Sequence, residues 1–169
     1  MLDRHLFIIG MPGCGKSSLG KRVAKETGMP FTDTDSLIAQ TCGGSVNDFF
    51  AAYGEDAFRR AETNTLIALS RARPMIISTG GGTVINPVNR EIMRNFGTIL
   101  LIDRPIEDIL GDIKLDRRPT LQEKGLPEVE RLYYERLPVY REAADHVLVN
   151  NKGYHMAVYS LVRLVKEWY

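Results

Sequence analysis

The residues best suited to chemistry stand near the start of the chain, in Gly10-Met-Pro-Gly-Cys-Gly15-Lys16-Ser17, which matches G-x-x-x-x-G-K-[ST]. In such a loop, glycines let successive backbone N–H groups point at phosphate oxygens, the lysine reaches the β and γ phosphates, and the hydroxyl ligates Mg²⁺. The motif predicts binding of ATP with Mg²⁺, with Lys16 in catalysis and Ser17 on the metal. The predicted nucleotide contacts are Gly13, Cys14, Gly15, Lys16, Ser17 and Ser18. The alternative is a loop that holds nucleotide only for switching or assembly.

Two carboxylates follow a short extended stretch in Asp33-Thr34-Asp35. At positions i and i+2 of an extended chain, side chains point the same way, so both should face one cleft. One carboxylate can serve the Mg²⁺ shell while the other accepts a hydrogen bond, or a proton, from an attacking hydroxyl. The alternative is that Asp35 or Ser36 caps the helix that follows.

Arginines and glycines supply a second group of candidates. Arg59 and Arg60 precede Glu62 in a helical segment, and Arg136 lies in another. Such side chains are usually solvated, but an acidic substrate needs the planar, permanently charged fork that arginine offers a carboxylate. Gly80-Gly81-Gly82 follows an apolar run, where it lets a ligand touch main chain or forms a tight turn.

The elements that position these residues alternate along the chain. The expected strands are His5–Gly10, Phe31–Asp33, Pro74–Thr79, Thr98–Asp103 and His146–Val149; the expected helical stretches include Lys16–Thr27, Ser36–Gln40 and Ser45 to about Arg71. Near-continuous apolar strands with helical crossovers predict an α/β fold of three layers, α/β/α, around a parallel sheet. The polar, proline-broken segment 116–127 carries Arg117-Arg118-Pro119 and is expected to be a lid over phosphates; an ordinary surface connection is the alternative.

Composition limits the class of protein. The length of 169 residues, 44% of them hydrophobic, predicts one domain over 1–169. The net charge of +1 gives no overall electrostatic field that would attract nucleic acid or a membrane surface. We found no apolar run of membrane-span length and no signal-peptide pattern, so a cytoplasmic protein is expected. We also expect a monomer. Cys14 and Cys42 are too few for a disulfide framework and are expected as free thiols. Cys14 stands inside the phosphate loop, where it is expected to fill a variable position.

Taken together and in order, these motifs resemble the shikimate kinase family from end to end. The matching segments are the Gly10–Ser17 loop, Asp33-Thr34-Asp35, Phe58-Arg59-Arg60, Ser78–Gly82, Arg117-Arg118-Pro119 and Arg136–Tyr140. The resemblance implies a five-stranded parallel sheet of the nucleoside-monophosphate-kinase type, with ATP and Mg²⁺ as cofactors. It also implies phosphoryl transfer to the 3-hydroxyl of shikimate, in chorismate and aromatic amino acid biosynthesis.

The same resemblance implies roles for single residues. Asp35 would contact the shikimate hydroxyls and take part in catalysis, and Arg59 and Arg136 would bind the shikimate carboxylate. Gly81 would contribute main chain, and Asp33 would hold Mg²⁺ through water. Arg118 in the lid would meet the ATP phosphates as a catalytic residue.

The chain departs from the family pattern on the adenine side. Many members have an arginine before the lid that packs on adenine, whereas Gly111–Asp116 offers only Lys114. The loop Asn150–Gly153 is assigned to adenine by its position alone. Kinases for gluconate or a nucleoside monophosphate remain alternatives, as does a non-catalytic, nucleotide-dependent regulatory relative. The combination of Asp35, Arg59, Gly80–Gly82 and Arg136 favours a small carboxylated ring.

Overall fold

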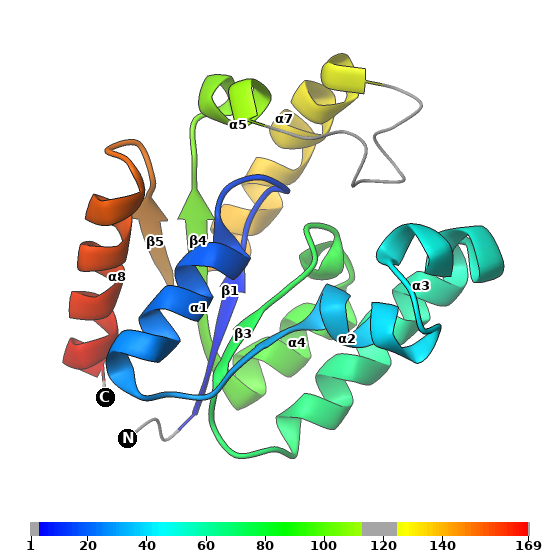
Figure 1. Cartoon of the computed structure of the whole chain (residues 1–169), viewed down its shortest axis with the longest axis horizontal. Coiled ribbons are helices and arrows are strands. Elements are labelled where there is room, and N and C mark those ends of the chain that lie inside the picture. Colours follow the sequence, from blue (N-terminus) through cyan, green and yellow to red (C-terminus); the bar gives the residue numbers. More distant parts are fainter. Residues whose placement is uncertain (1–3, 113–124, 169) are drawn as a thin grey trace.

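Five parallel strands form one sheet in the order β2-β3-β1-β4-β5 (Figure 1). The computed structural model describes residues 4–112 and 125–168. The strands are β1 (His5–Ile9), β2 (Phe31–Asp33), β3 (Ile76–Ser78), β4 (Gly97–Asp103) and β5 (His146–Val149). Every neighbouring pair is parallel, with Leu6 opposite both Ile76 and Thr98 in the centre. The predicted sheet is therefore confirmed.

Helices cover both faces of this sheet. They are α1 (Lys16–Thr27), α2 (Thr34–Thr41), α3 (Val46–Ser70), the 3-10 turn η1 (Thr83–Ile85), α4 (Pro87–Phe96), α5 (Ile106–Asp112), α7 (Gly125–Ala143) and α8 (Tyr154–Trp168). Helices α1 and α8 pack together on one side, while α4 and α7 contact β4 on the other (Figure 1). The fully buried β1 explains the continuous apolar run at this point of the sequence. In the described ranges no helix is both long and apolar enough to cross a membrane.

A smaller apolar cluster joins α2 to α3, at the side of the sheet where β2 lies. Ile38, Phe49 and Phe58 form its buried centre, and the rings of Phe49 and Phe58 meet edge to face at 5.7 Å. Helix α3 begins at a capping box between Ser45 and Asp48 and is kinked at Gly54, whose φ is 76°. The kink divides α3 into a short arm, which contributes Phe49 to this cluster, and a longer arm, which contributes Phe58 and leads to β3.

The predicted lid extends too far at its C-terminal end. Residues 125–127 of the expected segment 116–127 belong to the first turn of α7. Pro127 does not prevent this, because the first helical N–H groups have no partner inside the helix. The other residues of the expected lid, 116–124, lie outside the described residues.

Candidate active site

The phosphate-binding loop connects β1 to α1, as the sequence predicts. Gly13 and Gly15 have φ values of 87° and 103°, which other residues rarely adopt. The Lys16 ammonium donates to the carbonyl oxygens of Gly10 at 2.8 Å and Met11 at 3.0 Å, and the residue is only 8% exposed. It therefore lies along the loop, at a hollow of about 670 Å³.

This larger hollow gathers most of the predicted phosphate and metal residues. Its lining comprises Gly13, Gly15, Lys16, Ser17, Ser18, Lys21, Asp33, Asp35, Ser36, Thr79 and Gly81. Segments that follow β1, β2 and β3 thus meet at one place, outside the carboxyl ends of the strands. In an open parallel sheet, this is where ligands bind.

Ser17 and Asp33 form the candidate metal site. The Ser17 hydroxyl donates to Asp33 Oδ2 at 2.5 Å and lies 3.1 Å from the Ser78 hydroxyl. Among the described residues, no group of three or more His, Cys, Asp or Glu side chains could hold a metal ion. One hydroxyl and one carboxylate suit Mg²⁺, which is usually bound through one or two protein oxygens with phosphates and waters.

The Asp33-Thr34-Asp35 segment has a different geometry from the one predicted. Strand β2 ends at Asp33, and Asp35 already lies in the first turn of α2. Asp33 Oδ1 accepts from the Ser36 N–H at 3.1 Å, so Asp33, rather than Asp35 or Ser36, caps the helix. Both carboxylates still face the larger hollow. The prediction of a shared cleft is correct, but the extended stretch offered as its reason is wrong.

The Gly80–Gly82 turn lies where the functional segments converge. A Cβ atom on Gly80 would stand 2.5 Å from Asp35 Oδ1, and one on Gly81 would stand 2.7 Å from the ring of Pro12 in the phosphate loop. One on Gly82 would collide with the Arg59 guanidinium. The three glycines have no left-handed φ. Glycine is therefore needed at these positions because neighbouring groups approach closely, and not because the backbone is left-handed.

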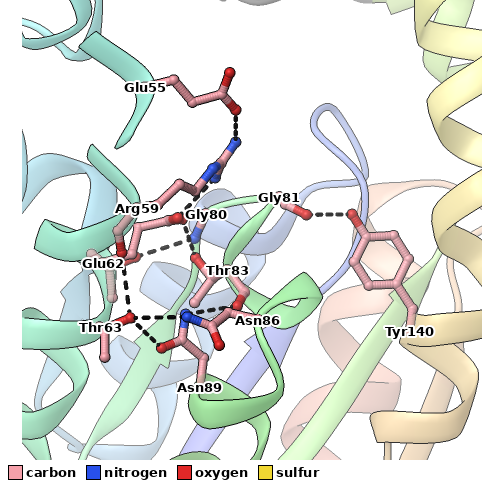
Figure 2. A network of polar contacts seen from close by, with 11 residues as sticks. Glu55, Arg59, Glu62, Thr63, Gly80, Gly81, Thr83, Asn86, Asn89 and Tyr140 are labelled. Carbon is pink, nitrogen blue, oxygen red and sulfur yellow. Dashed lines mark hydrogen bonds and ion pairs between the residues drawn. The ribbon is translucent and has the colours of Figure 1, made fainter. Parts of the chain in front are cut away.

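Arg59 is held by carboxylates on its own helix (Figure 2). Its guanidinium donates to Glu62 at 2.8 Å and to Glu55 at 3.0 Å. The Glu62 side chain is 1% exposed, and its second oxygen accepts from the Thr83 hydroxyl at 2.5 Å. Burial alone would lower the pKa of Arg59, but Glu62 and Glu55 outweigh it and raise that pKa above its ordinary value. Arg59 therefore stays charged and fixed beside the glycine turn.

The contacts of Thr83 extend to helix α4. Asn89 Nδ2 donates to the Thr83 carbonyl oxygen at 2.8 Å, and Asn89 Oδ1 accepts from the Thr63 hydroxyl at 2.8 Å (Figure 2). Thr83 and Asn89 are both buried. The network ties α3, η1 and α4 together behind Arg59.

Tyr140 holds the other side of the glycine turn. Its hydroxyl donates to the Gly81 carbonyl oxygen at 2.6 Å (Figure 2). Burial raises the pKa of Tyr140 well above its ordinary value, while the positive charges of Arg136 and Arg59 oppose that rise. Both predicted carboxylate-binding arginines therefore act electrostatically on one buried hydroxyl, although neither lines the larger hollow. Arg60, the neighbour of Arg59, is exposed.

A second, smaller hollow of about 420 Å³ adjoins the phosphate loop. Its lining is Gly15, Ser18, Leu19, Arg104, Asp108, Asp112, Asn150, Asn151, Gly153 and Tyr154. It shares Gly15 and Ser18 with the larger hollow, so the two meet at the start of α1. Three residues of the predicted adenine-side loop 150–153 are on it, and Arg104 is an addition that the motifs did not suggest.

Cys14 and the lid arginines complete the comparison with the predictions. Cys14 and Cys42 are free thiols, as predicted, but the Cys14 side chain is fully buried in the core, which leaves it no access to reagents. The Cys14 N–H, a predicted ATP contact, donates to the Met11 carbonyl oxygen at 3.2 Å. Lys114 and Arg118 lie outside the described residues.

Sequence reasoning missed the residues that hold the predicted ones in place. Glu62 follows Arg59 by three positions and Glu55 precedes it by four, spacings that put all three on one helix face and could have identified the ion pairs. Thr83 and Tyr140 had no comparable signal, because their partners are distant in the chain.

Comparison with known proteins was made against families, sequences and structures. The family model described as shikimate kinase matches residues 12–165. A shikimate kinase of Clostridium botulinum strain Eklund 17B is 36% identical over 164 residues, which are 97% of this chain and 98% of that protein. A shikimate kinase of Paracidovorax citrulli is 39% identical over 156 residues, which are 90% and 85% of the two chains.

Solved structures give the same result. The shikimate kinase from Acinetobacter baumannii in complex with shikimate matches with a TM-score of 0.87 and 29% sequence identity, over 97% of this chain and 91% of that chain. The predicted fold class is thereby confirmed at the level of the whole architecture. Because the family model spans most of the chain and close relatives match it over nearly their full length, the chain belongs to the shikimate kinase family.

Proposed function

We propose that the larger hollow is where this enzyme transfers the γ-phosphoryl group of ATP to the 3-hydroxyl of shikimate, giving shikimate 3-phosphate and ADP. As a member of its family, the protein is a Mg²⁺-dependent kinase of chorismate and aromatic amino acid biosynthesis. The roles proposed for single residues rest on the Gly80–Gly82 turn, because Asp35, Arg59 and Pro12 of the phosphate loop all lie close to it. A phosphate donor and an acceptor bound on either side of this turn would be adjacent.

At the phosphate end, Lys16 would leave the loop carbonyls and donate to the β and γ oxygens of ATP. Phosphoryl transfer through a loose transition state needs positioning and charge neutralisation more than covalent chemistry. A buried ammonium with few competing waters is suited to that task. We assign a similar role to Arg118, from the family resemblance.

Ser17 and Asp33 would hold Mg²⁺, Ser17 through its hydroxyl and Asp33 through a water molecule. When bound there, Mg²⁺ would supply positive charge that offsets the negative charge of the ATP phosphates. The hydrogen bond of 2.5 Å between the two side chains keeps both oxygen donors at one point of the hollow.

At the acceptor end, Asp35 would accept a hydrogen bond from the attacking hydroxyl and take its proton as the phosphoryl group arrives. Arg59 and Arg136 would bind the carboxylate on the opposite side of the ring. Gly81 would offer its N–H, since Tyr140 already engages its carbonyl. All these groups come from one chain, which supports a monomer as the active unit.

A coupled ADP-release assay with shikimate, gluconate and nucleoside monophosphates tests the substrate assignment. In the presence of ATP we expect turnover with shikimate and with none of the other acceptors. Removal of Mg²⁺ by EDTA should abolish this turnover. Comparable turnover with gluconate would contradict the proposed acceptor site. An absence of turnover with any acceptor, in a folded protein that binds ATP, would favour the regulatory alternative.

The carboxylate clamp is tested with Arg136→Ala and a shikimate analogue whose carboxylate is reduced to an alcohol. Loss of one charged hydrogen bond, about 1.5–3 kcal/mol, should raise KM for shikimate roughly 10- to 100-fold. KM for ATP should stay unchanged, and the analogue, a poor ligand of the wild type, should be almost indifferent to the substitution. A change of twofold or less in KM for shikimate would remove the main support for the clamp.

A further inference from the structure

The phosphate loop is held on the side of the smaller hollow by two side chains from other strands. Arg104 follows β4, and its guanidinium donates to the Gly13 carbonyl oxygen at 3.0 Å. Asn150 follows β5, and its Nδ2 donates to the Cys14 carbonyl oxygen at 3.1 Å. Two successive carbonyls of the loop thus have donors far away in the sequence.

The orientation of these carbonyls also fixes the N–H groups of the loop. A trans peptide unit is planar, with its C=O and N–H pointing in opposite directions. Holding the Gly13 and Cys14 carbonyls towards the smaller hollow therefore turns the N–H groups of Cys14 and Gly15 the other way. The Cys14 N–H accordingly donates across the loop to Met11 at 3.2 Å. Inward N–H groups are what this kind of loop offers to phosphates.

The two donors are themselves anchored to the sheet and to each other. Arg104 donates to Asp112 at 2.5 Å through its other terminal nitrogen, and its side chain is 22% exposed. The Asn150 N–H donates at 2.7 Å to the carbonyl oxygen of Asp103, the residue directly before Arg104. The Asn150 amide nitrogen also lies 3.4 Å from the point where a Cβ on Gly15 would stand. Arg104 and Asn150 therefore form one brace at the ends of β4 and β5.

We propose that Arg104 and Asn150 are positioning residues that keep the phosphate loop in its binding conformation. The inference rests on the proposed nucleotide site. Both residues act on main-chain carbonyls, so their effect on ATP passes through the orientation of the loop N–H groups. Without either donor, a loop peptide can rotate and present a carbonyl where a phosphate oxygen needs an N–H.

Arg104 also lines the smaller hollow, so a direct contact with the nucleoside is the competing role. Titration calorimetry with ADP and with tripolyphosphate, both in the presence of Mg²⁺, separates the two, because tripolyphosphate has neither base nor ribose. A loop brace predicts that Arg104→Met and Asn150→Asp weaken binding of both ligands by similar factors. For the loss of one hydrogen bond we expect about three- to tenfold.

The variants differ in a way that adds a second check. Asn150→Asp preserves size but places a carboxylate oxygen against the Cys14 carbonyl oxygen, so it should have the larger effect. Arg104→Lys keeps a cationic donor and should recover part of the tripolyphosphate affinity. Both brace variants should lower kcat while leaving KM for shikimate unchanged. Arg22→Ala, which removes an exposed ion pair with Glu26 on α1, is the matched control and should change neither affinity.

The outcomes are distinct. A loss of ADP affinity with unchanged tripolyphosphate affinity would overturn the brace and assign Arg104 to the nucleoside. Unchanged affinities for both ligands would also overturn it. If Arg104→Met fails to fold, Asn150→Asp and Arg104→Lys still decide the question. Failure of the wild type to bind ADP or tripolyphosphate would instead refute the nucleotide site on which the brace rests.

Discussion

Arg59→Ala should lower the free energy of unfolding and raise KM for shikimate. The two effects arise from separate contacts of the guanidinium. Within the protein, the guanidinium donates to Glu62 at 2.8 Å and to Glu55 at 3.0 Å. Glu62 is 1% exposed, so the variant leaves a buried carboxylate. This carboxylate still accepts the hydrogen bond from the Thr83 hydroxyl but no longer has an ion-pair partner in Arg59. Glu55, by contrast, is 59% exposed and can be solvated.

The magnitudes follow from burial. Removing one partner of a buried ion pair costs about 3–5 kcal/mol. The Arg59 side chain is 32% exposed, which places the expected loss at the lower end, about 3 kcal/mol of unfolding free energy. The exposed pair with Glu55 adds at most about 1 kcal/mol. The lost bond to the shikimate carboxylate should raise KM roughly 10- to 100-fold.

Urea denaturation followed by circular dichroism, together with the KM for shikimate, measures the two effects. The double variant Arg59→Ala/Glu62→Gln should recover most of the stability, because the buried charge is gone, but none of the shikimate affinity. Arg60→Ala, at the exposed neighbouring position, should change neither quantity. If Arg59→Ala proves as stable as Arg60→Ala, the argument from Glu62 is wrong. If the double variant restores KM, Arg59 does not bind the substrate carboxylate.

Three further predictions concern Lys16 and Tyr140 at the site and the buried His5. Lys16→Met should lower kcat by about 100-fold or more, since it removes a preorganised charge from a developing anion, while calorimetry should show that shikimate still binds; near-normal turnover would refute the assignment. Tyr140→Phe leaves the Gly81 carbonyl without its donor and should cost about 1 kcal/mol in urea denaturation, with a several-fold higher KM for shikimate; wild-type values of both would show that the bond is dispensable. Burial lowers the pKa of His5 from 6.5, so the unfolded chain takes up a proton at a higher pH than the folded protein does. Unfolding free energy should therefore fall as pH drops below about 6.5, by up to about 1.4 kcal/mol per pH unit, and level off below the folded pKa; an equally steep fall in His5→Gln would contradict this.

Local structure was predictable wherever one segment carried its own signal. Helix α1 spans Lys16–Thr27 and β5 spans His146–Val149, as expected from the glycine-lysine loop and the short apolar run. The prediction failed where one side chain changed the course of the backbone. Asp33 accepts a hydrogen bond from the Ser36 N–H, and α2 begins at Thr34, two residues before the expected start at Ser36. An interpretation of 33–35 as extended chain could not include this cap. Pro127 suggested the lid, but a proline in the first turn is compatible with helix.

Partners distant in the chain were beyond sequence reasoning for a different reason. Tyr140 reaches Gly81, and Arg104 reaches Gly13, only because β3 and β4 flank β1 in the sheet. The order of the strands was not predicted, so no rule of spacing could select these pairs. The same limit applies to the roles of Arg59 and Arg136 at one carboxylate, which stay predictions until the variants are measured.

Once the buried face of α3 is known, one distinction within the site follows from residue spacing. Phe58, Glu62 and Leu66 are spaced by four residues, and all three are buried along one stripe of α3. A carboxylate in an apolar stripe must be paired, because an unpaired buried charge is strongly unfavourable. Arg59 is three positions from Glu62 and can reach it, whereas Arg60 is two positions away and points elsewhere. The buried glutamate therefore selects Arg59 over Arg60 as the fixed arginine, and it does so by the chemistry of burial without any knowledge of the substrate.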